Sequence, residues 1–111
     1  MTVKPLLPSL REKKRYVAFE VQAAHAIEFA LAKKSVEESL QGFLGTLGMA
    51  KAGVLFLNDW KKNRGIMKVN TQYVNEVKAA LALVQEIAGE KEIIRSVGVS
   101  GSLEKIRSLY F

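Results

Sequence analysis

Residues 10–21 read LREKKRYVAFEV, a stretch in which a basic segment runs directly into an apolar strand pattern. After Tyr16, apolar side chains recur at every second position, at Val17, Phe19 and Val21, which is the period of a β-strand. A strand of this kind must bury its apolar face in a core, whereas the basic segment attracts phosphate. The stretch therefore predicts a charged arm attached to the first strand of a folded domain.

The length and composition of the chain favour one domain with an arm. With 111 residues, of which 49% are hydrophobic, the chain can bury one modest core but not two. We place the arm at residues 1–15 and the domain at residues 16–111. Cysteine is absent, which excludes disulfides, thiolate metal sites and a cysteine nucleophile. No segment approaches the roughly 18 uncharged residues that a membrane span requires, and we expect a soluble, cytoplasmic protein.

Positive charge is concentrated in the arm. The chain carries a formal net charge of +6 and has a pI near 9.7. Within residues 1–15 the acidic residue Glu12 is outnumbered by Lys4, Arg11, Lys13, Lys14 and Arg15. A short track of positive charge is typical of segments that contact a nucleic-acid backbone, because each neutralised phosphate releases counterions. We expect the arm to contact nucleic acid; the alternative is a solvated tail.

Hydrophobic periodicity and turn residues predict further elements after the first strand. The start of the next helix is open between about residue 28 and Ser35, where the spacing is that of a capping box. In chain order we expect a helix from about residue 28 to the glycines at positions 45 and 48, a strand over 52–58, a polar turn over 58–63, a strand over 64–69, a helix from Asn70 or Thr71 to Gly89, a strand over 92–99 and a short helix over 103–109.

The order βαββαβα is typical of the α+β class. Two split βαβ units form an antiparallel four-stranded sheet with both long helices on one face, the ferredoxin-like or RNA-recognition-motif (RRM-like) sandwich, here with an added C-terminal helix. The second face of this sheet is also apolar, since Tyr16 and Ala18 lie opposite the face of Val17. We expect this second face to bind a partner or a second copy of the chain. The alternative is that the last helix folds across it.

The sequence lacks the constellations that catalysis needs. His25 is the only histidine, so a histidine relay or cluster has no second member, and we expect no catalytic residue and no metal site. Residues 98–102, GVSGS, depart from a nucleophile elbow at the last position, and no histidine follows them. Residues 22–25, after the first strand, contain neither arginine nor glycine, which excludes an acylphosphatase-type phosphate cradle.

Basic residues outside the arm indicate contact with a nucleic-acid backbone rather than base stacking. The third strand offers Ile66 and Met67 where an RRM carries stacking aromatic rings. The turn over 100–102 presents backbone amides to phosphate at the start of the last helix. The basic residues of the predicted hairpin and the last helix are Lys61, Lys62, Arg64, Lys68, Lys105 and Arg107.

Four segments together resemble the archaeal ribonuclease P protein component 2 family. The likeness runs in the same order over residues 7–109, and its first and last motifs are the specific ones. The segments are LPSLREKKRYVAF (7–19), RGI (64–66), VKAALALV (77–84) and IIRSVGVSGS (93–102).

The resemblance implies a non-catalytic subunit of the ribonucleoprotein that removes 5′ leaders from precursor tRNA. In this family the RNA component cleaves with magnesium, so the protein is expected to bind no cofactor itself. Its implied partners are the RNase P RNA, precursor tRNA indirectly, and a second RNase P protein with a TIM-barrel-like fold. The other hypothesis is a ferredoxin-like protein-interaction or ligand-binding module with an incidental basic tail. The match carries over, as RNA-facing or structural positions, Arg11, Lys13, Lys14, Arg15 and Arg95.

Overall fold

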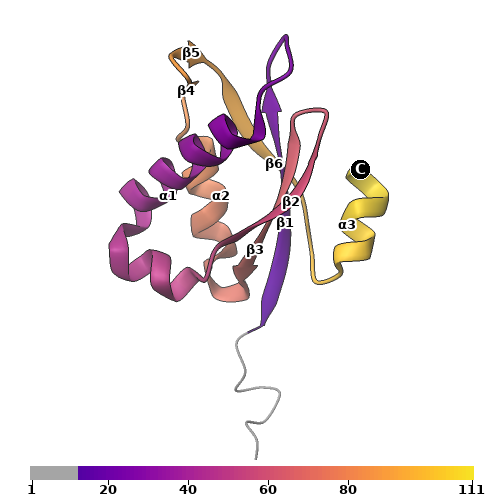
Figure 1. The fold of residues 1–111 in the computed structure, drawn as a ribbon. Coiled ribbons are helices and arrows are strands. Elements are labelled where there is room, and N and C mark those ends of the chain that lie inside the picture. Colours follow the sequence, from indigo (N-terminus) through magenta and orange to yellow (C-terminus); the bar gives the residue numbers. More distant parts are fainter. Residues whose placement is uncertain (1–12) are drawn as a thin grey trace, which may run out of the picture.

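Four antiparallel strands in the order β2-β3-β1-β6 form the central sheet of the protein (Figure 1). The structure is a computed structural model, and it describes residues 13–111. The first strand begins at Lys14, two residues earlier than the alternation in the sequence suggested. The strands are β1 (Lys14–Gln22), β2 (Leu55–Lys61), β3 (Arg64–Asn70) and β6 (Ile93–Ser100).

Helices cover both faces of this sheet. In Figure 1, α1 (Phe29–Ala52) and α2 (Val74–Ala82) lie on one face, and α3 (Leu103–Tyr110) lies on the other. A 3₁₀ turn over Thr71–Tyr73 leads into α2. The predicted α+β, ferredoxin-like architecture is confirmed, and the first helix begins close to residue 28, the earlier of the two expected starts.

The larger core lies between the sheet and the two long helices. Val17, Phe19 and Val21 are buried there, as the alternation in β1 predicted. Leu40 of α1 and Leu81 of α2 pack into the same cluster. Full burial of side chains of this size contributes about 1.5–3 kcal/mol each, so this layer supplies most of the apolar stabilisation.

A smaller core lies on the second face, beneath α3. Ala18, Ile66 and Ile106 are buried together in it. Tyr110 donates a hydrogen bond from its hydroxyl to the carbonyl of Val97, 2.7 Å away, and its ring occupies the space that a Cβ on Gly98 would need. The chain therefore covers this apolar face with its own last helix, which was the alternative to a face left open for a partner.

The helices differ from the expected boundaries at two places. The glycines expected to end α1 produce only a kink at Gly45, which has a φ of 73°, and the helix continues to Ala52. The second helix ends at Ala82 rather than near Gly89. A small hairpin replaces its predicted last turns, formed by β4 (Glu86–Ile87) and β5 (Glu90–Lys91). Within residues 13–111 no helix is long and apolar enough to cross a membrane.

The turn between β2 and β3 is shorter than predicted. Instead of a loop over 58–63, β2 extends to Lys61 and the reversal uses only Lys62 and Asn63. Both residues have positive φ, 52° and 60°, which is the backbone of the type I′ turn that matches the twist of paired strands. Asparagine tolerates this left-handed conformation better than most residues, which accounts for its place there.

Candidate nucleic-acid interface

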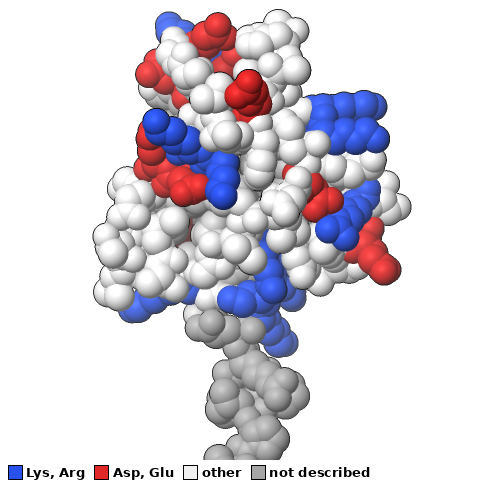
Figure 2. All heavy atoms as spheres, viewed as in Figure 1, with Lys and Arg blue, Asp and Glu red and all other residues white. Residues whose placement is uncertain are grey.

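Charge is divided between the two layers of the fold. The sheet, its β2–β3 turn and α3 carry nine Lys and Arg residues against three Asp and Glu residues, counted over 14–22, 55–70 and 93–110. The helical layer and the β4–β5 hairpin carry five against seven, counted over 23–54 and 71–92. Figure 2 shows basic side chains over the β2–β3 turn and α3, and again at the lower end of β1. We call the side that bears α3 the basic face.

Glu20 of β1 joins two arginines of the neighbouring strands. Its register places it opposite Arg64 of β3 and Arg95 of β6, and partners in an antiparallel pair share a face. Arg64 Nε donates to one carboxylate oxygen at 2.6 Å, and Arg95 Nη2 donates to the other at 3.3 Å. The hydrogen bond from Arg64 lowers the pKa of Glu20; partial burial opposes the shift, and Arg95 adds to it. Arg64 and Arg95 are therefore held in place on either side of Glu20.

The end of α3 organises a second group of cations. Arg107 makes a bidentate ion pair with Asp59 of β2, with N–O distances of 2.9 and 3.1 Å, which raises the pKa of the arginine. Arg64 Nη1 and Lys61 Nζ donate to the backbone carbonyls of Tyr110 and Phe111, each at 3.4 Å. Cations are favourable at a helix C-terminus, where carbonyl groups lack helical partners.

Several predicted lysines have side chains that the described residues leave unpaired. Lys62 and Lys105 are exposed, on the β2–β3 turn and on α3, and Lys13 is exposed just before β1. Lys68 of β3 is partly buried and lies opposite Tyr16 in the sheet register. Within residues 13–111 no hydrogen bond or ion pair engages these four ammonium groups, so they are available to an external anion.

The cations at the start of β1 point to different faces, since the ammonium of Lys14 lies near Gly53, just after α1. Lys14 bonds through its ammonium group to the side-chain oxygen of Asn70, and Arg15 Nη1 donates to the carbonyl of Lys14 at 3.1 Å. The guanidinium of Arg15 also lies beside Gly101, in the turn before α3. Tyr16 packs into the smaller core next to α3. The predicted position Arg11 lies outside the described residues.

The sequence predictions missed the acidic residues that hold this face together. Glu20 and Asp59 pair with cations far away in the sequence, so only the strand register and the docking of α3 reveal the contacts.

A second missed feature lies near the β4–β5 hairpin, where ligating atoms of His25, Glu90 and Glu92 come within 4.8 Å of one another. No sequence spacing indicated that these three side chains meet.

Comparison with known proteins agrees with the resemblance seen in the sequence. The model of the Rpp14/Pop5 family matches residues 15–111. The ribonuclease P protein component 2 of Thermococcus gammatolerans is 41% identical over 105 residues, covering 94% of this chain and 88% of that protein. The protein of the same name from Methanococcus maripaludis is 32% identical over 108 residues, covering 97% of this chain and 82% of that protein.

A solved structure has the same fold. A chain in the cryo-EM structure of yeast ribonuclease MRP matches with a TM-score of 0.65 at 16% sequence identity, covering 83% of this chain and 76% of that chain. At this identity the likeness concerns the fold alone, and the sequence matches carry the relationship. On those matches, the chain belongs to the Rpp14/Pop5 family.

Proposed function

We propose that this chain, a ribonuclease P protein subunit of the Rpp14/Pop5 type, binds the RNA component through its basic face and supports RNA-catalysed removal of 5′ leaders from precursor tRNA. The chemistry belongs to the RNA and its magnesium ions, and the protein contributes positive charge and a rigid shape. Contact with precursor tRNA is indirect, through the folded RNA.

The uneven distribution of charge carries this proposal. The sheet, its β2–β3 turn and α3 have a surplus of six positive charges, whereas the helical layer and the β4–β5 hairpin have a surplus of two negative ones. A face of this kind gains affinity for a phosphate backbone by displacing counterions, without reading bases. The ion pairs of Glu20 and Asp59 support the same role, because they fix three arginines in place before RNA arrives.

Reconstitution tests the function directly. Precursor tRNA is incubated with the RNase P RNA and the other protein subunits of the same organism, with and without this chain. The expected result is faster cleavage and a lower magnesium requirement when the chain is present, because protein cations replace part of the ionic screening that the folded RNA needs. An unchanged rate and magnesium dependence would refute the assignment.

A protein partner is the second part of the proposal. Because α3 covers the second sheet face, we propose that the TIM-barrel-like RNase P subunit contacts the exposed side of α1 near its kink, where Phe43 and Leu47 are 46% and 67% exposed.

Leu47→Glu should weaken the complex by at least about tenfold in calorimetry, because a charge would be buried without a partner. Leu109→Glu, at an equally exposed position on α3, is the matched control. Equal loss in both variants would refute this contact surface.

A further inference from the structure

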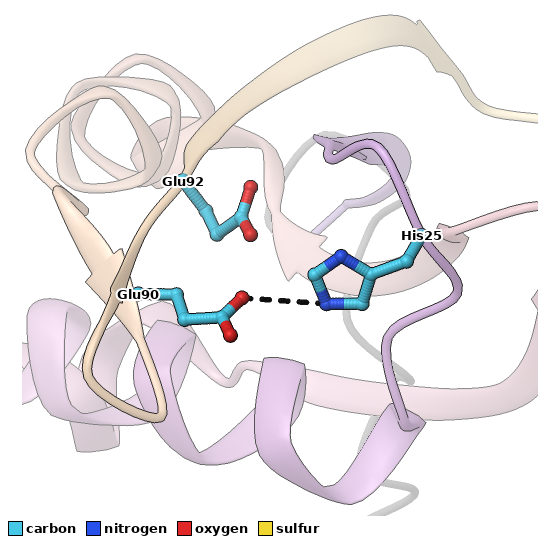
Figure 3. A group of neighbouring side chains, drawn as sticks. All are labelled: His25, Glu90 and Glu92. Carbon is cyan, nitrogen blue, oxygen red and sulfur yellow. Dashed lines mark ion pairs between the residues drawn. The ribbon is translucent and has the colours of Figure 1, made fainter.

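Three ligating side chains converge at the end of the molecule that carries the β4–β5 hairpin (Figure 3). His25 lies in the loop between β1 and α1, Glu90 lies in β5, and Glu92 lies just before β6. Their ligating atoms all lie within 4.8 Å of one another, and His25 Nε2 is 3.4 Å from Glu90 Oε2. This group is separate from the cations of the basic face.

The hairpin explains why the two carboxylates lie together. Residues two apart in an extended segment point to the same side, so Glu90 and Glu92 face one way and Lys91 the other. The turn at Ala88 and Gly89 returns the chain, and the amide of Glu92 donates to the carbonyl of Gln85 at 3.1 Å. The backbone that carries the second carboxylate is therefore held in place.

The histidine loop is fixed from the opposite side by Asn63 of the β2–β3 turn. The side-chain amide of Asn63 donates to the carbonyl of His25 at 2.9 Å and accepts from the amide of Ile27 at 2.8 Å. The indole of Trp60 donates to the carbonyl of Ile27 at 3.0 Å. These bonds hold the loop so that the imidazole faces the hairpin.

Glu92 is the informative member of the group. The residue is only 8% exposed, and Figure 3 shows its carboxylate directed at His25. Among residues 13–111 no hydrogen bond or ion pair engages this carboxylate. The carboxylate oxygens still reach solvent, because no fully buried side-chain oxygen of the described residues lacks a partner. A bound cation would replace that water with a charged partner, which a largely buried carboxylate favours.

We propose that His25, Glu90 and Glu92 bind a divalent transition-metal ion of the zinc type. One imidazole nitrogen and two carboxylate oxygens form a ligand set that suits Zn²⁺ better than Mg²⁺, which prefers oxygen alone. His25 and Glu90 line a hollow of about 310 Å³, and Glu92 lines another of about 1100 Å³, so water can reach the ligands to complete the coordination. The ion would tie the β1–α1 loop to the β4–β5 hairpin.

The geometry requires only a small contraction. Two ligands about 2.1 Å from a tetrahedral ion are about 3.4 Å apart, which the His25–Glu90 separation of 3.4 Å already matches. The remaining separations must shorten toward that value. The side chains of His25 and Glu90 are 56% and 64% exposed, so both can rotate toward the fixed carboxylate of Glu92.

The single histidine makes the test direct, because the imidazole signals of the protein belong to His25 alone. Tag-free, metal-stripped full-length chain is titrated with Zn²⁺ while the imidazole nitrogens are followed by ¹H–¹⁵N NMR. The expected result is a shift of these signals that saturates at one equivalent, with a higher unfolding temperature. Mg²⁺ at the same concentration should leave the signals in place.

Variants identify the ligands. Glu92→Gln and Glu90→Gln should each weaken Zn²⁺ binding by about tenfold or more, whereas Glu86→Gln, on the same hairpin but outside the group, should leave it within about twofold. If Glu92→Gln fails to fold, the titration of the wild-type chain and Glu90→Gln decide the question. Unmoved imidazole signals, or an affinity unchanged in Glu90→Gln, would overturn the proposal. Neither result depends on RNA binding, so the site and the proposed function stand or fall separately.

Discussion

At the scale of single residues, Glu20 has the largest influence on the basic face. Without its charge, Arg64 and Arg95 would flank β1 with no anion between them. The carboxylate is partly buried and both of its oxygens accept a guanidinium bond, so the interaction is stronger than that of an exposed surface pair. One acidic residue thereby determines where two basic ones can point.

Glu20→Gln should destabilise the protein in a pH-dependent way. At neutral pH we expect the free energy of unfolding to fall by about 1–3 kcal/mol, the usual range for a hydrogen bond to a charged group. The pKa of Glu20 is lowered from its ordinary value of 4.5 by folding, so its stabilisation is complete above that pH. The difference between wild type and variant should shrink as the pH falls through the lowered pKa. Urea unfolding between pH 7 and pH 2 measures it.

Glu38→Gln is the matched control for this measurement. Glu38 is exposed on α1, and no ion pair or hydrogen bond engages its side chain within the described residues. The control should differ from wild type by less than about 0.5 kcal/mol at every pH. A pH-independent loss in Glu20→Gln would show that shape, rather than charge, explains the contribution of this residue.

At the scale of elements, the sequence predicted the sheet and the layer of two long helices but not every boundary. Alternation identified β1 because its large apolar side chains Val17, Phe19 and Val21 occupy every second position, although Ala18 between them is buried on the other face. The second helix was extended too far because Val84 and Ile87 continue its apolar spacing and are indeed buried. Their burial comes from an irregular segment and from β4, so apolar spacing alone could not distinguish the two structures.

The sequence predicted the basic residues of the candidate interface but not the acidic residues that pair with them. The basic residues stand out in the sequence, and the structure brings most of them to one face. Their acidic partners do not stand out, since Asp59 meets Arg107 only after α3 has docked on the sheet. The docking itself was left open, because an apolar stripe on a short helix indicates a buried side without identifying the surface that buries it.

The turn of the β4–β5 hairpin gives a prediction at this scale. Ala88 and Gly89 both have positive φ, 53° and 83°, as a type I′ turn requires, but alanine is strained there. Ala88→Asn creates the Asn-Gly pair that this turn favours, and we expect a gain of about 0.5–1 kcal/mol in the free energy of unfolding, measured in the presence of a chelator. Ala24→Asn, in an exposed loop without positive φ, should change stability by less than about 0.5 kcal/mol. An equal gain in both would contradict the strain argument.

At the scale of the whole molecule, the two layers separate two tasks. The sheet and α3 present the positive surface, while the helical layer holds the larger core and the acidic hairpin. At long range the protein should attract RNA to the sheet and α3, because a polyanion that approaches the helical layer meets more acidic than basic side chains. The orientation of the protein on RNA should therefore follow from charge alone.

Paired lysine variants test this orientation. Lys62→Gln with Lys105→Gln removes two exposed charges from the basic face, and Lys34→Gln with Lys78→Gln removes two from the helical layer. Both double variants change the net charge equally, so they differ only in position.

If the basic face contacts phosphate, the first double variant should reduce the slope of log K against log salt by about 1.5, since each neutralised phosphate contributes about 0.7–0.9. The second should leave the slope within about 0.3 of wild type, because these charges remain solvated. Fluorescence anisotropy with RNase P RNA between 50 and 300 mM salt, over which the Debye length falls by roughly a factor of two, measures both slopes. Equal reductions would mean that RNA responds to net charge rather than to a face, and a flat response in wild type would favour a protein-interaction module with incidental basic residues.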